Sequence, residues 1–190
     1  QGLASHGAVI AIISFLCYFA WKYKMSALWL LDRLSLVIPI AAGMVRIGNL
    51  MNHEIVGSIT TVPWAFDFTL GGPGIAGTLR HPAQLYEACV YLLLFLAFFI
   101  YYFKFAKGKV PAGRATGLLL FVIFTARFII EFFKEVQVSK EVGMTLDIGQ
   151  KLSIPFIIIG LILLIYSIVK RDNIPVYKEI NWQKDKTVKK

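Results

Sequence analysis

Five apolar runs, each close to 20 residues long, take up most of this 190-residue chain. A helix needs about 20 residues to cross roughly 30 Å of hydrocarbon, and backbone groups cannot stay unpaired in lipid. We therefore predict an all-α integral membrane protein, a polytopic helical bundle. About five transmembrane helices are expected, over residues 4–21, 28–48, 85–103, 116–133 and 152–169. The composition agrees: with 57% hydrophobic and 16% charged residues, the chain has too few polar groups to cover a soluble domain.

The lysines and arginines outside these runs gather on alternate links. Thirteen of the 20 lie after the first or third run or beyond the last one, and four lie in the links 49–84 and 134–151. Because basic links stay in the cytoplasm, these two links are predicted to face outward and the C-terminus inward. We expect residues 1–169 to form the transmembrane bundle and 170–190 a basic cytoplasmic tail at anionic lipid heads. The net charge of +9 then reflects topology rather than nucleic-acid binding.

The second run carries most of the charge at membrane depth. Asp32 and Arg33 near its start suggest that this end lies in the membrane interface. At its outer end, Arg46, Asn49 and Asn52 recur every three residues and so share one helix face, with Glu54 close behind. An arginine here is costly unless it pairs or binds an anion, and its planar fork suits a phosphate or carboxylate. A snorkelling side chain is the alternative, but the amides and carboxylate favour a binding site.

Two further polar groups lie on the same predicted side. Arg127 and Glu131 in the fourth run are spaced i, i+4, so they can pair. Arg127 lies about 10 Å below the outer surface at 1.5 Å per residue, either in a structural ion pair or facing a cavity. His6 opens the first run. A lone histidine at a helix mouth is more often a hydrogen-bonded interface residue, yet imidazole is the usual proton acceptor near neutral pH.

The segment that opens the third run has an equally good structural explanation. Pro82 is tolerated at a helix start and Glu87 suits the helix dipole, so function and structure are balanced for Arg80 and His81. Cys17 and Cys89 lie inside apolar runs and are expected to be packing residues, with neither a disulfide nor a metal site. Residue chemistry alone thus predicts an outer-leaflet enzyme or binding protein for lipid headgroups.

Several motifs, taken in their order along residues 2–169, resemble the prolipoprotein diacylglyceryl transferase family. They are Gly2-Leu3-x-Ser5-His6-Gly7, Arg46-x-Gly48-Asn49-x-x-Asn52-x-Glu54-x-x-Gly57, Arg80-His81-Pro82-x-Gln84-Leu85-Tyr86-Glu87, Arg127-Phe128-x-x-Glu131-Phe132-Phe133 and the stretch 149–155. No single motif would suffice.

The resemblance implies a transferase of the bacterial cytoplasmic membrane, with its active site toward the outer leaflet. Such an enzyme transfers the diacylglyceryl group of phosphatidylglycerol to the lipobox cysteine thiol of a prolipoprotein, forming a thioether and releasing glycerol phosphate. It implies catalytic roles for His6, Arg46 and Arg127. Substrate-binding positions implied in the same way are Asn49, Asn52, Glu54, Gly57, His81 and Glu131.

These roles make chemical sense. A thiol with a pKa of about 8.5 needs a base, for which His6 is the candidate. Arg46 and Arg127 would stabilise the charge that grows on the leaving phosphate, with Glu54 and Glu131 aiming the two guanidiniums. The two asparagines would orient the headgroup. No metal or redox cofactor is expected.

The chain also departs from the family pattern. His53 stands where the family usually has glycine, and we favour an interfacial role for it over a share in the base function. The family has helices and an essential tyrosine before its His-Gly segment, so we expect further helices before residue 1 in the native protein. Two other functions remain open: an anion or lipid transporter with Arg127 in the path, and a non-catalytic, phospholipid-binding subunit. The chain shows no internal repeat of the kind common in transporters.

Overall fold

The computed structural model describes residues 5–72, 74–135 and 146–170. Within these ranges, every predicted apolar run is a helix, which confirms the all-α class. The helices are α1 (Ser5–Lys22), α2 (Ala27–Met51), α3 (Ala83–Ile100), α4 (Arg114–Glu131) and α5 (Ile148–Val169). A π-helical turn, η1 (Tyr101–Phe105), extends α3, and the short strands β1 (Phe66–Asp67) and β2 (Leu79–Arg80) form an antiparallel pair.

Three of these helical segments are long and apolar enough to cross a membrane: α2, α3 with η1, and α5. They identify the chain as a helical membrane protein. The apolar part of α1, Ile10–Lys22, is shorter. Helix α4 carries Arg114, Arg127 and Glu131 within its 18 residues, which lowers its apolar character. Five membrane crossings therefore stay a prediction.

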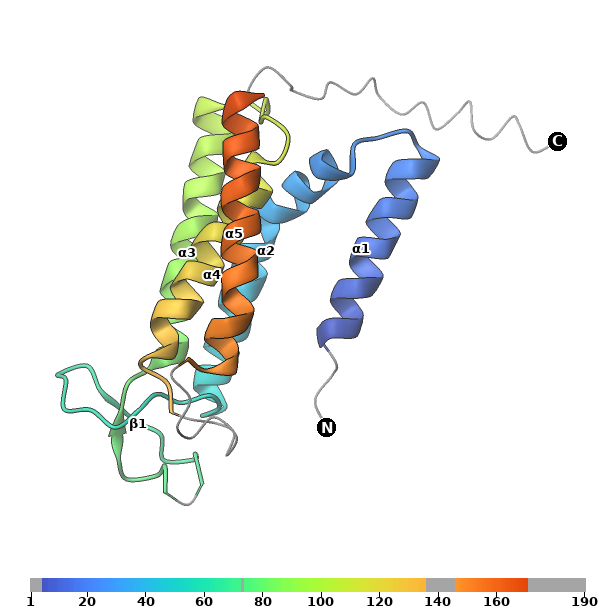
Figure 1. Ribbon diagram of the computed structural model, residues 1–190. Helices are drawn as coiled ribbons and strands as arrows, with labels where there is room; N and C mark the ends of the chain where they lie inside the picture. The colour runs from blue at the N-terminus through green and yellow to red at the C-terminus, as the bar shows by residue number, and fades with distance from the viewer. Residues whose placement is uncertain (1–4, 73, 136–145, 171–190) are drawn as a thin grey trace.

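Helices α2 to α5 lie side by side with alternating direction, whereas α1 stands apart from them (Figure 1). The closest backbone approach is between α4 and α5. A Cβ atom added at Gly160 would lie 2.6 Å from the backbone nitrogen of Phe121, and one at Gly117 would lie 2.9 Å from that of Leu164. Small residues at such crossings let helices approach in lipid, where apolar surface alone gives little driving force for association.

Asp32 joins α2 to the start of α4. Its carboxylate is only 4% exposed; it accepts hydrogen bonds from the Gly113 and Thr116 backbone nitrogens at 2.6 and 2.8 Å, and from the Thr116 hydroxyl at 2.8 Å. Gly113 has a φ of 84°, which a glycine adopts without strain. The negative charge at the positive end of α4 is favourable. The charge expected at the membrane interface therefore serves as a cap for another helix.

The long links, of which residues 52–72, 74–82 and 132–135 are described, meet at one end of the bundle, opposite the links 23–26 and 106–113 (Figure 1). There the guanidinium of Arg80, only 2% exposed, binds the Glu135 carboxylate at 2.6 Å. It also donates to the carbonyls of Gly57 and Gly74 and to the Thr78 hydroxyl. Arg80 is thus a structural centre of this end.

Candidate functional site

A chain of ion pairs crosses the bundle near the end that carries the long links. Glu87 on α3 is fully buried, and its carboxylate oxygens lie 2.5 Å from Nε of Arg46 on α2 and 3.0 Å from Nζ of Lys134. Lys134 follows α4 and also binds Glu131 at 3.0 Å. The network therefore ties together α2, α3 and the end of α4.

Arg127 lies close to this network and adds a further positive charge. The hydroxyl of Tyr91, on α3, lies near Arg46 and within electrostatic reach of Glu87 and Arg127. The group thus contains three cations and two carboxylates. The cations are Arg46, Arg127 and Lys134, and the carboxylates are those of Glu87 and Glu131. Buried charge is costly unless it is compensated. The excess of one positive charge favours an anionic ligand.

Both arginines line a single cavity of about 300 Å³ between α2, α3 and α4. Its other polar lining residue is Tyr91, which is 2% exposed. The remaining walls are aliphatic or aromatic, from Ile38, Ala42, Val45, Leu119, Leu120, Ile123 and Phe124. Guanidiniums above apolar walls suit a ligand with a phosphate group and hydrocarbon chains, because the arginines bind phosphate and the walls exclude water.

The structure corrects the expected partners of the two arginines. Arg46 pairs with Glu87 rather than Glu54, whose side chain is exposed. Glu131 pairs with Lys134, and among the described residues Arg127 forms no ion pair. The reason is that the chain turns back directly after α4, which brings Lys134 onto Glu131.

Glycine at position 149 leaves room for the Glu131 carboxylate. A Cβ atom added at Gly149, in the first turn of α5, would lie 2.7 Å from Oε1 of Glu131. The start of α5 therefore packs directly against this carboxylate and limits where it can turn. This contact and the ion pair with Lys134 hold the Glu131 carboxylate in a position where it does not pair with Arg127.

Asn49, Asn52 and Glu54 lie just beyond this cavity. Helix α2 ends at Met51, and Asn52 caps it through its backbone N–H, bonded to the Gly48 carbonyl. The Asn49 side chain is half-buried, whereas Asn52 is exposed. The carbonyl of Glu54 accepts a 2.6 Å hydrogen bond from Gln84. None of the three predicted residues lines the described cavity, and their part in substrate binding stays a prediction.

Gly57 and His81 belong to the packing of the loops. A Cβ atom added at Gly57 would clash with the His81 backbone and lie 2.7 Å from the carbonyl oxygen of Phe133. Gly57 also donates its N–H to the His81 carbonyl, at 3.1 Å. The His81 ring lies 3.0 Å from the Tyr86 hydroxyl, through Nδ1. Two predicted substrate-binding positions thus have a clear structural task.

The other two histidines differ in what the structure describes. His53 accepts a 3.0 Å hydrogen bond from the Leu70 backbone N–H through Nδ1, so its ring supports the loop. His6 is in the first turn of α1, which begins toward the end with the long links (Figure 1). The His6 side chain lies outside the described residues, and its role as base stays a prediction.

Sequence reasoning missed Glu87, Lys134 and Tyr91 as members of this site. In the sequence, the helix dipole accounts for Glu87, and Lys134 is one of the four basic residues in the links predicted to face outward. The i, i+4 spacing of Glu87 and Tyr91 places both on one face of α3, and that was the available signal. Within the described part of the chain, no cluster of three or more histidine, cysteine, aspartate or glutamate residues could hold a metal ion.

The family model described as prolipoprotein diacylglyceryl transferase matches residues 1–166. The chain belongs to this family. A phosphatidylglycerol–prolipoprotein diacylglyceryl transferase of Bacteroides fragilis is 45% identical over 161 residues, 85% of this chain and 56% of the relative. One from Chloroherpeton thalassium is 41% identical over 168 residues, 88% of this chain and 61% of the relative.

The match to the prolipoprotein diacylglyceryl transferases covers the whole charged site. Arg46, Glu87, Arg127 and Lys134 all fall within the matched range. The chain nevertheless spans less than two thirds of the length of these relatives. What the relatives are named for is therefore carried to this chain only as a proposal.

Proposed function

We propose that the protein transfers the diacylglyceryl group of phosphatidylglycerol to the lipobox cysteine thiol of prolipoproteins. The observation that carries this proposal is the cavity in which Arg46 and Arg127 face apolar walls. The names of the family's members supply the reaction. The substrate combines an anionic phosphate with two hydrocarbon chains; the two arginines suit the phosphate, and the apolar walls suit contact with hydrocarbon.

The reaction is a displacement at the glycerol carbon that bears the phosphate. A C–S bond forms as the C–O bond breaks, the thiol proton goes to a base, and glycerol phosphate leaves with the bonding electron pair. Negative charge grows on the leaving phosphate, so Arg46 and Arg127 stabilise the transition state more than the bound lipid. His6 is the candidate base, as predicted from the sequence.

Glu87 positions the guanidinium of Arg46. Its contact is at Nε, and the Arg46 side chain also lines the cavity, where a guanidinium can bind phosphate oxygens. Lys134 shares the Glu87 carboxylate and prevents that charge from neutralising Arg46 completely. The site keeps its excess positive charge and thus its preference for an anion.

We further propose that the protein crosses the bacterial cytoplasmic membrane five times, with the site toward the outer leaflet and the C-terminus in the cytoplasm. The support is the count of lysine and arginine outside the apolar runs: 13 lie after the first or third run or beyond the last one, and four lie in the links 49–84 and 134–151. The positive-inside rule assigns the more basic set to the cytoplasm.

The test uses the protein produced from its complete gene, with phosphatidylglycerol and a synthetic lipobox peptide. We expect a thioether-linked peptide and glycerol phosphate in equal amounts. Arg127→Gln should abolish both products, whereas Lys170→Gln, which removes a charge at the opposite end, should leave the rate unchanged. Bound lipid without either product would instead support the non-catalytic, phospholipid-binding subunit. Lipid movement across vesicles without product would support the transporter.

A further inference from the structure

Arg33 lies in a second polar site, at the end of the bundle away from the catalytic cavity. Its guanidinium carbon lies 4.9 Å from the ring centroids of both Trp29 and Tyr102. One terminal nitrogen, Nη2, donates to the Gly108 carbonyl at 3.1 Å. The other, Nη1, is buried and has no hydrogen-bond partner among the described residues. A charged donor group is therefore out of water without an acceptor, which is costly.

The Asp32 carboxylate acts electrostatically on Arg33 but forms no ion pair with it. Among the described residues Arg33 forms no ion pair, and the adjacent Asp32 directs both oxygens to the start of α4. In the segments 23–37 and 95–114, which form this end of α2 and of α3 to α4, Asp32 is the only acidic residue. The other charged side chains there, such as Lys104 and Lys107, are basic. Within these two segments the net charge is positive, which favours an anionic ligand.

The surroundings of Arg33 define the kind of anion. It heads a cavity of about 240 Å³ between α2 and α3–η1, whose other walls include Leu36, Val37, Phe95, Phe99 and Phe103. Val37, Phe99 and Phe103 are more than half exposed, so the cavity opens along the outer faces of two helical segments that are long enough to span a membrane. A cation at one end and apolar walls along the membrane-facing side match a phospholipid with an anionic head.

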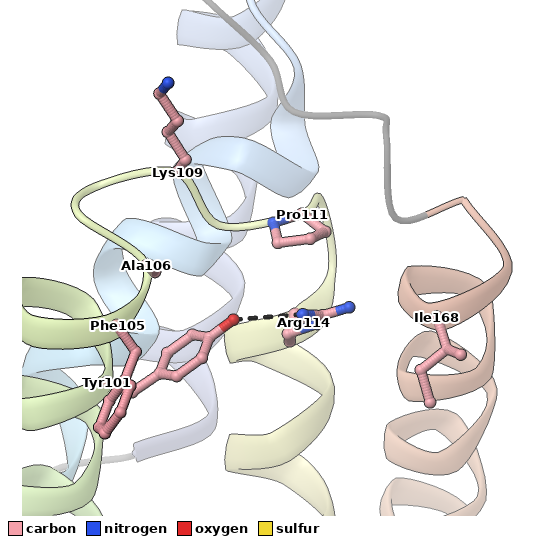
Figure 2. A pocket seen from close by; sticks show the side chains of 7 residues that line it. All are labelled: Tyr101, Phe105, Ala106, Lys109, Pro111, Arg114 and Ile168. Atoms are coloured by element: carbon pink, nitrogen blue, oxygen red, sulfur yellow. Dashed lines mark hydrogen bonds between the residues drawn. The ribbon is translucent and has the colours of Figure 1, made fainter.

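The larger cavity at the same end of the bundle does not contain an arginine that needs an anionic partner. It holds about 450 Å³ beside Arg114 (Figure 2), but the guanidinium nitrogens of Arg114 already bind the Ser167 hydroxyl and carbonyl and the Tyr101 hydroxyl. Lys109, which also lines it, points away from Arg114 (Figure 2). Arg114 has its partners within the protein, whereas Arg33 does not.

We propose that an anionic phospholipid occupies the groove between α2 and α3–η1, with its phosphate at the guanidinium of Arg33 and an acyl chain along the phenylalanines. This site is separate from the cavity of Arg46 and Arg127 and does not rest on the proposed transfer reaction. The bound lipid completes the polar contacts of Arg33 and so holds α2 to the link between α3 and α4. The π-helical turn η1 brings Tyr102 over the guanidinium, and such turns are frequent at functional sites.

Trp29 makes the groove observable, since its ring stacks on Arg33. The protein produced from its complete gene is placed in phosphatidylcholine vesicles with brominated lipid, which quenches nearby tryptophan fluorescence. The difference between wild type and Trp29→Phe isolates the Trp29 signal while keeping a ring over Arg33. We expect brominated phosphatidylglycerol to quench this signal at a mole fraction about ten-fold below that needed with brominated phosphatidylcholine.

Arg33→Gln should abolish this preference, and the matched Lys170→Gln, at the same end but after α5, should retain it. Arg127→Gln should also retain it, because the groove is separate from the catalytic cavity. If Arg33→Gln does not fold, competition in the wild type decides: unlabelled phosphatidylglycerol should relieve the quenching, whereas unlabelled phosphatidylcholine and soluble glycerol phosphate should not. Equal quenching by both brominated lipids, or relief by glycerol phosphate, would overturn the proposal.

Discussion

The Oε2 atom of Glu87 lies 2.5 Å from the Nε atom of Arg46, in a carboxylate that is fully shielded from solvent. This contact joins α2 to α3 and holds the guanidinium of Arg46, a residue that lines the proposed catalytic cavity. Removing one partner of a buried ion pair leaves the other charge uncompensated, at a cost of several kcal/mol. Glu87 is therefore expected to affect both the stability of the bundle and the orientation of the Arg46 guanidinium.

Replacing Glu87 by Gln should separate these two effects. The amide keeps one hydrogen-bond acceptor for Arg46 or Lys134 but loses the negative charge. The net charge of the site therefore becomes one unit more positive, and the Arg46 guanidinium is held less firmly in position. We expect kcat to fall roughly 10- to 100-fold, because small misplacements of a positioning group cost that much, with little rise in KM. Steady-state kinetics on phosphatidylglycerol measure the split. A loss confined to KM would show that Glu87 acts on binding alone.

Arg127→Lys should produce a stable but inactive protein. Arg127 makes no ion pair with a described residue, so its loss costs little in folding, while a lysine cannot hold two phosphate oxygens at once. We expect kcat/KM to fall about 100-fold or more, with the thermal unfolding midpoint in detergent unchanged.

Arg46→Lys is the matched comparison for Arg127→Lys. It should lose activity and also lower the unfolding midpoint, since Arg46 is bound to Glu87. If Arg127→Lys unfolded as readily as Arg46→Lys, the structural explanation for Arg127 would be preferred over the catalytic one.

Gly57→Ala should destabilise the end that carries the long links. The added methyl group would meet the backbones of His81 and Phe133, which are held by hydrogen bonds and cannot move apart freely. We expect a loss of about 1–3 kcal/mol in unfolding free energy, measured by denaturant or thermal unfolding. Gly48→Ala is the control, since no heavy atom lies within 4 Å of a Cβ added there. Equal stability of the two variants would contradict the tight crossing at Gly57.

Asp32→Ala should weaken the bundle without changing the KM for phosphatidylglycerol. The carboxylate binds two backbone N–H groups and a hydroxyl at the start of α4, far along α2 from Arg46. We expect a loss of about 2 kcal/mol or more, because the N–H groups would be buried without an acceptor. Ser26→Ala, which removes a longer 3.4 Å cap from α2, should cost less. A KM change in a protein of normal stability would contradict this purely structural role.

The sequence by itself determined the five helices and the alternation of basic links, because both depend on local properties. An apolar run must satisfy its own backbone hydrogen bonds in lipid, so its length and composition define a helix without reference to its neighbours. The motifs around Arg46 and Arg127 also identified the two cations that the structure places on one cavity.

Only the tertiary structure decided the partners of these charges. Helical spacing favours an ion pair between Arg127 and Glu131, but the turn after α4 brings Lys134 onto Glu131 instead. The packing of α3 on α2 places Glu87 beside Arg46. Asp32 and Arg33, adjacent in sequence, likewise diverge: one caps α4 and the other faces the groove beside α3. A charge pairs with the nearest opposite charge in space, and that neighbour is set by which helix faces pack together, which no local pattern records.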